Sequence, residues 1–180
     1  IGVRTIFNLL GPLTNPASAP NQLMGVFDPS WIQSLLEVLR DLGSQHVLIV
    51  SAEDGLDELS VSAPTHVGEL KDGEISTYSV APADFGITQY DDYNMLKIDN
   101  AVESLVMLRQ ALAGESGAQG DNQAAFDIVA LNAGAAIYAA NLCASLAQGV
   151  ERAIAVLKSG EALGKLDQLA QFTQSISARE

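Results

Sequence analysis

The chain contains 180 residues, of which 48% are hydrophobic, and its mean hydropathy is +0.18. This composition predicts a folded globular domain with a sizeable core and excludes an intrinsically disordered protein. The 22 acidic residues outnumber the 9 basic ones, which gives a formal net charge of −13. Because so acidic a surface repels phosphate backbones, we expect the protein not to bind nucleic acid.

The same composition predicts a cytoplasmic protein. Polar residues interrupt every apolar run well before the ~20 residues that span a bilayer, so we expect no transmembrane helix. The first residues lack the basic flank and the small-residue cleavage site of a signal peptide. The single cysteine, Cys143, rules out an internal disulfide framework and fits a reducing compartment. We expect it to be a small buried residue without chemistry.

The opening segment, residues 4–16, places one arginine before an apolar run that glycine and proline interrupt. The pattern predicts a short helix over residues 5–10 that ends at Gly11 and continues as an ordered loop. Burial of the apolar side chains would fix the backbone around Arg4. A fixed guanidinium suits a planar carboxylate, because its N–H groups match two oxygens at once. A structural salt bridge is the alternative role for Arg4, and the residues alone favour it.

Residues 22–50 have the pattern of a strand, a helix and a second strand. An apolar run at residues 22–27 predicts a buried strand, and Asp28 and Pro29 predict the start of a helix that ends at Gly43. A second apolar run, at residues 46–50, predicts another buried strand. Short connections imply a right-handed βαβ crossover with parallel strands, covered on both faces. The helix carries its apolar residues on one broad face: Trp31, Ile32, Leu35, Leu36, Val38, Leu39 and Leu42.

An acidic loop follows the second strand. Ligands of open α/β sheets bind beyond the carboxyl ends of strands, which is where this loop begins. Its four carboxylates, from Glu53, Asp54, Asp57 and Glu58, are the ligand type that Mg²⁺ prefers. The alternative, favoured by the residues alone, is a solvated acidic loop. We expect Glu53 and Asp54 to be surface or turn residues.

The rest of the chain predicts a β-hairpin, an irregular loop and several helices. Asp72 and Gly73 favour a tight turn between the hairpin strands, and Asn100 favours the start of a helix. His46 and His66 lack the spacing of a zinc site, so we expect them to be packing or surface residues. The predicted segments are hairpin strands 65–70 and 74–80, loop 81–98, linker 114–122, and helices 123–146, 148–158 and 161–176. The predicted fold is therefore α/β: part of a mainly parallel sheet with a βαβ crossover, a β-hairpin and flanking helices.

Four segments together resemble the anthranilate phosphoribosyltransferase family. They are Gly-Val-Arg-Thr-Ile-Phe-Asn-Leu-Leu-Gly-Pro-Leu-Thr-Asn-Pro at residues 2–16, Asp-Gly-Leu-Asp-Glu at residues 54–58, Pro-Ala-Asp-Phe-Gly at residues 82–86 and Leu-Asn-Ala at residues 131–133. The resemblance covers most of the chain. Members of the family carry an upstream helical domain and a glycine-rich Gly-Thr-Gly-Gly-Asp loop that binds phosphoribosyl pyrophosphate, and neither is in this sequence. The resemblance therefore implies that residues 1–180 are the carboxyl-terminal portion of the α/β domain, inactive alone.

The resemblance also implies a reaction. Members of the family transfer a phosphoribosyl group from phosphoribosyl pyrophosphate to anthranilate and release pyrophosphate, in tryptophan biosynthesis. By resemblance, Arg4 binds the anthranilate carboxylate, Asp57 and Glu58 bind Mg²⁺, and the complete enzyme is a homodimer. No residue matches a general base. Two alternatives are a nucleoside phosphorylase of the same broad fold and a non-catalytic relative that binds nucleic acid.

Overall fold

The computed structural model describes residues 11, 13–14, 16–114 and 121–177. Arg4, the helix predicted over residues 5–10 and most of the predicted linker 114–122 lie outside these residues. Among the described helices, none is long and apolar enough to cross a membrane.

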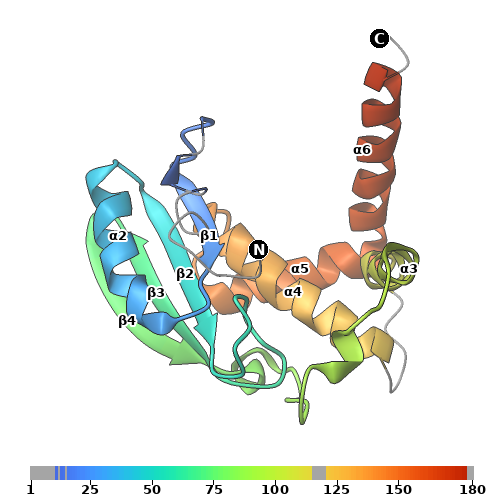
Figure 1. The fold of residues 1–180 in the computed structure, drawn as a ribbon, viewed down its shortest axis with the longest axis horizontal. Helices are drawn as coiled ribbons and strands as arrows, with labels where there is room; N and C mark the ends of the chain where they lie inside the picture. The colour runs from blue at the N-terminus through green and yellow to red at the C-terminus, as the bar shows by residue number, and fades with distance from the viewer. Residues whose placement is uncertain (1–10, 12, 15, 115–120, 178–180) are drawn as a thin grey trace.

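The described strands form one sheet with the order β1-β2-β3-β4 (Figure 1). Parallel pairing joins β1 (Asn21–Gly25) to β2 (His46–Ala52), with Met24 opposite Ile49. Antiparallel pairing joins β2 to β3 (Thr65–Lys71), and β3 to β4 (Glu74–Val80). The predicted βαβ crossover and hairpin are both confirmed.

The described sheet is mixed, which corrects the expectation of a mainly parallel one. The first strand of the hairpin lies directly beside β2, so both pairings that involve β3 are antiparallel. The turn between β3 and β4 has positive φ at Asp72 (52°) and at Gly73 (85°). Positive φ at both central residues is the geometry that matches the twist of hairpin strands.

Helix α2 (Ile32–Asp41) covers one face of the sheet. A short 3₁₀ turn, η1 (Pro29–Trp31), directly precedes this helix. The Asp28 carboxylate accepts a hydrogen bond from the Ser30 N–H, as predicted for an N-cap. Gly43, with φ 87°, ends the helix as predicted. The buried face is narrower than predicted, because α2 packs against a single layer. Ile32, Leu35, Leu36 and Leu39 are buried, whereas Trp31, Val38 and Leu42 are exposed.

Strand β2 is buried along its whole length between two apolar cores. Val47 and Ile49 pack with the buried residues of α2, while Leu48 and Val50 belong to the core on the opposite face. Both faces of this strand are therefore covered, which confirms the interpretation of its uninterrupted apolar run.

Helices α4 (Asp121–Ala139) and α5 (Leu146–Ser159) cover the second face. They approach so closely that a Cβ at Gly134 would meet the backbone of Val150, and one at Gly149 would meet the carbonyl oxygen of Gly134. The prediction of one helix over residues 123–146 is wrong at its end. Asn141 takes a left-handed conformation with φ 59°, which turns the chain before α5 begins.

Two further helices lie beyond the sheet. Helix α3 (Ala101–Leu112) begins at Asn100, whose side chain accepts hydrogen bonds from two backbone N–H groups as predicted. Helix α6 (Glu161–Ser177) follows Gly160 and projects away from the body of the molecule (Figure 1). The predicted loop 81–98 contains two short 3₁₀ turns, η2 (Pro82–Phe85) and η3 (Asn94–Leu96). The α/β class predicted from the sequence is thus confirmed.

Candidate functional site

The acidic loop begins where β2 ends, as predicted, and Asp54 organises it. One carboxylate oxygen of Asp54 accepts the hydroxyls of Ser60 at 2.5 Å and Ser62 at 2.6 Å. The other accepts the backbone N–H of Leu56 at 3.2 Å. Asp54 is therefore more than the surface or turn residue expected: its oxygens are occupied by the loop itself, which leaves it poorly placed as a metal ligand.

The backbone of Asp57 lies against β1. A Cβ built on Gly25, the last residue of β1, would overlap the backbone carbonyl of Asp57. Only glycine allows this approach, and the contact fixes where the loop lies over the sheet. The side chains of Asp57 and Glu58 are both exposed, and they extend from the loop at the carboxyl end of β2.

Asn132 of α4 holds the loop from the opposite side. Its Oδ1 accepts the backbone N–H of Leu59 at 2.9 Å, and its Nδ2 donates to the backbone oxygen of Leu59 at 3.0 Å. The same Nδ2 donates to the backbone oxygen of Ile128, one turn earlier in α4, at 3.0 Å. Leu59, which directly follows Glu58, is almost completely buried.

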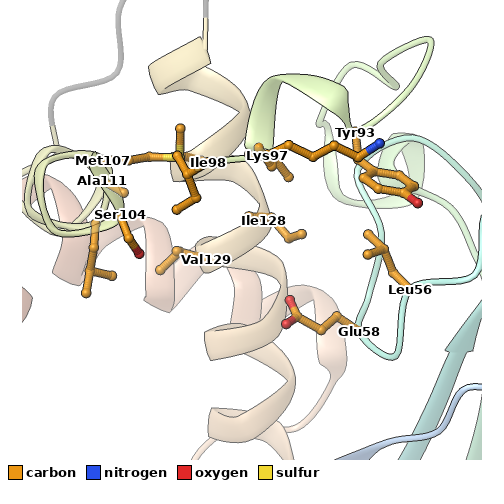
Figure 2. A pocket seen from close by; sticks show the side chains of 13 residues that line it. Leu56, Glu58, Tyr93, Lys97, Ile98, Ser104, Met107, Ala111, Ile128 and Val129 are labelled. Atoms are coloured by element: carbon orange, nitrogen blue, oxygen red, sulfur yellow. The ribbon is translucent and has the colours of Figure 1, made fainter. Parts of the chain in front are cut away.

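A largely apolar cavity of about 480 Å³ opens beside this loop. Figure 2 shows the carboxylate of Glu58 extending toward α4, with Leu56 and Tyr93 on the same side of the cavity and Met107 and Ala111 of α3 across it. The ammonium of Lys97 lies 5.2 Å from the centre of the Tyr93 ring and donates to the Asn94 side chain at 2.6 Å. This cation is therefore already engaged at the rim of the cavity.

The pKa of Glu58 lies above its usual value. Partial desolvation beside the cavity is the main cause, and the negative charge of neighbouring Asp57 adds to it. Within the described part of the chain, neither carboxylate forms a salt bridge.

This donor set fits a magnesium ion. Mg²⁺ binds through one or two protein carboxylates and completes its shell with water and substrate phosphate oxygens. Asp57 and Glu58 supply two exposed, adjacent carboxylates whose mutual repulsion a cation would relieve. In the described part of the chain, no three His, Cys, Asp or Glu side chains are grouped closely enough for a closed protein cage. A magnesium ion held by this pair would take its remaining ligands from water and substrate oxygens.

The two histidines have the roles expected of packing and surface residues. His46 is 1% exposed, and its ring nitrogens lie 2.7 Å from Asn141 Oδ1 and 3.1 Å from Glu69 Oε1. Tyr138 of α4 also donates to Glu69, at 2.7 Å, so the network joins the sheet to the helix layer. His66 is partly exposed on β3, with Nε2 3.7 Å from Glu53.

Four polar contacts that support the site were not predicted from the sequence. The bonds of Asp54 to Ser60 and Ser62 were visible only as a spacing of six and eight residues. The Asn132–Leu59 contact joins residues 73 positions apart, so no local pattern signals it. Tyr90, in the loop before α3, donates to buried Asp127 of α4 at 2.8 Å and anchors that loop.

Comparison with known proteins identifies the family of this chain. The family profile described as "Glycosyl transferase family, a/b domain" matches residues 1–163, so the chain belongs to this family. A Methylococcus capsulatus protein named anthranilate phosphoribosyltransferase is 53% identical over 178 residues, which are 99% of this chain and 50% of that protein. The chain spans about half the length of the curated relatives that it matches. The resemblance drawn from the sequence motifs is confirmed.

Solved structures agree with the fold. The anthranilate phosphoribosyltransferase of Thermus thermophilus superposes with a TM-score of 0.84 at 39% identity, over 96% of this chain and 49% of that one. The Saccharomyces cerevisiae enzyme, in complex with PRPP and Mg, superposes with a TM-score of 0.77 at 25% identity, over 92% of this chain and 46% of that one.

Proposed function

We propose that this chain supplies the metal-binding and acceptor-binding half of an anthranilate phosphoribosyltransferase of tryptophan biosynthesis. The complete enzyme would transfer a phosphoribosyl group from phosphoribosyl pyrophosphate to anthranilate and release pyrophosphate. The observation that carries the proposal is the exposed carboxylate pair, Asp57 and Glu58, at the carboxyl end of β2 beside the cavity. Family membership and the names of the relatives support it.

Asp57 and Glu58 would hold Mg²⁺ in this reaction. The ion, when bound, neutralises negative charge on the pyrophosphate and helps it to depart. A metal ion is the expected source of positive charge, because only 9 of 180 residues are lysine or arginine. The presence of PRPP and Mg in the yeast relative supports this assignment.

Arg4, which lies outside the described residues, would bind the carboxylate of anthranilate through its two-pronged guanidinium. Orientation is the main contribution that the acceptor requires, since an aromatic amine is largely unprotonated at neutral pH and needs little activation. We therefore assign no general base.

By resemblance to the family, we also propose that the complete enzyme is a cytoplasmic homodimer. Residues 1–180 would form a carboxyl-terminal portion of its α/β domain, and this portion alone would lack the donor-binding loop. Sedimentation of the complete enzyme tests the dimer.

The proposal is tested by replacing both carboxylates, D57N with E58Q, in the complete enzyme. We expect the magnesium dependence of anthranilate consumption to shift to higher concentrations. The matched control is D91N with D92N, which neutralises another adjacent and exposed acidic pair and keeps an amide oxygen at position 92 to accept from the Asn94 N–H. Superposable magnesium curves for D57N/E58Q and wild type would contradict the proposal. Phosphorolysis of a nucleoside with free phosphate, without anthranilate consumption, would favour a nucleoside phosphorylase instead.

A further inference from the structure

The side chain of Asn132 forms hydrogen bonds with the backbone of the acidic loop, as the backbone of a neighbouring strand would do. It meets both the N–H and the C=O of Leu59, a residue that lies outside the strands of the sheet. Leu59 is 1% exposed, so these backbone groups have little access to water. Leaving such a buried group without a partner costs about 1–3 kcal/mol.

The contact constrains the peptide bond that joins Glu58 to Leu59. The N–H of Leu59 belongs to the planar unit that joins Glu58 to Leu59, so fixing this N–H also fixes the backbone orientation at Glu58. The bond from Nδ2 to the Ile128 oxygen within α4 holds the amide in the orientation that serves Leu59. Helix α4 is thereby coupled to the backbone that carries the Glu58 carboxylate.

The loop is held at three places around this pair. Asp54 closes it through Ser60 and Ser62, Gly25 allows the Asp57 backbone to approach β1, and Asn132 holds Leu59. The first contact lies within the loop and the second joins the loop to the sheet. Of the three, only the Asn132 contact joins the loop to the helix layer. A purely apolar contact would serve packing at this position, as neighbouring Leu131 and Ala135 do. The amide of Asn132, in contrast, forms directional hydrogen bonds that orient the backbone of Leu59.

We propose that Asn132 is a positioning residue for the magnesium-binding pair Asp57 and Glu58. The proposal rests on the function proposed above, because it requires that the pair binds the metal. Partners that orient metal ligands typically contribute 10–100-fold to metal affinity.

The test measures binding of Mn²⁺ to the complete enzyme by electron paramagnetic resonance, together with the thermal midpoint. N132L removes all three hydrogen bonds at similar size, and N132D keeps the acceptor for the Leu59 N–H but sets a charged oxygen against two carbonyls. The control Y138F removes two other hydrogen bonds between α4 and the sheet, the one that Tyr138 donates to Glu69 and the one that it accepts from Lys71. We expect both Asn132 variants to bind Mn²⁺ about 10–100-fold more weakly, while Y138F lowers only the thermal midpoint.

Two further readouts keep the outcomes separate. Hydrogen exchange of residues 54–60 should accelerate in N132D and stay unchanged in Y138F. Unchanged Mn²⁺ affinity in N132D or N132L, with a fall in thermal midpoint like that of Y138F, would overturn the positioning role alone. Unchanged Mn²⁺ affinity in D57N/E58Q would overturn both this role and the assignment of the metal pair.

Discussion

The backbone carbonyl of Asp57 occupies the space in which any residue other than glycine at position 25 would place its Cβ. This contact sets the acidic loop against the end of β1. It also places the exposed carboxylates of Asp57 and Glu58 beyond the carboxyl ends of a parallel strand pair, the usual position of ligands in open α/β sheets.

Replacing Gly25 with alanine should therefore displace the loop. We expect G25A to lower the free energy of unfolding by about 1–3 kcal/mol, the usual cost of overpacking, and to raise the magnesium concentration needed for activity. The control is G164A in α6, where an added Cβ meets no atom within 4 Å. That variant should be neutral or more stable, since alanine favours a helix over glycine. Equal behaviour of the two variants would refute the close approach.

Asp54 should be required for the loop and not for direct metal binding. The variant D54A removes the acceptor of the Ser60 and Ser62 hydroxyls and of the Leu56 N–H. Because the two hydroxyls are 3.2 Å apart, one can still donate to the other, but the second is left without this acceptor. We expect a loss of about 1–3 kcal/mol in urea unfolding, the cost of unsatisfied buried groups. The exposed residue Asp91 provides the control, D91A, which should change stability by less than about 0.5 kcal/mol. A free energy of unfolding of D54A equal to that of wild type would show that these bonds do not support the loop.

The buried carboxyl of Asp127 should make stability depend on pH. Desolvation raises its pKa above the usual 3.8, although hydrogen bonds from Tyr90 and Gln123 oppose the shift. A raised pKa means that the folded state binds the proton more tightly than the unfolded state. The resulting stabilisation is complete below pH 3.8 and is lost as pH rises through the raised value.

The variant D127N removes this titration and retains an oxygen that can accept from Tyr90. We expect the free energy of unfolding of D127N, relative to wild type, to increase as pH rises from about 3.8. Urea unfolding between pH 3.5 and 7 provides the measurement. A relative stability that stays constant or decreases over this range would contradict the direction of the shift.

Arg4 should contribute to anthranilate binding. We expect R4A in the complete enzyme to raise the Michaelis constant for anthranilate roughly tenfold to a hundredfold, because a hydrogen bond to a charged group contributes about 1.5–3 kcal/mol. The Michaelis constant for phosphoribosyl pyrophosphate should change little. The control R40A removes an exposed arginine of α2 and should leave both constants unchanged. An unaltered constant for anthranilate in R4A would exclude this role.

Local signals explain which parts of the fold were predictable. Asp28, Pro29 and Gly43 mark the ends of the segment that contains α2, and the apolar run of β2 is buried along its length. The end of α4 was not predicted, because the alanine-rich sequence continues past Ala139 and the break depends on the conformation of Asn141. The mixed character of the sheet depends on which strand lies beside β2, a long-range choice that the hairpin pattern does not specify.

The candidate site also has parts that were predictable from the sequence and parts that were not. The acidic loop at the end of a strand was predictable, since a buried strand and the residues after it are consecutive in sequence. The contact from Asn132 to Leu59 was not, because it depends on where α4 packs against the sheet. The roles of Arg4, Asp57 and Glu58 remain predictions drawn from the family resemblance.

The most direct test of the account measures anthranilate fluorescence with phosphoribosyl pyrophosphate, with and without Mg²⁺, on samples of known intact mass. We predict that the enzyme of full family length consumes anthranilate only when Mg²⁺ is present. The 18.9 kDa chain alone should not consume it. Turnover by the 18.9 kDa chain, or turnover that does not depend on Mg²⁺, would contradict the account of how donor and metal sites are divided.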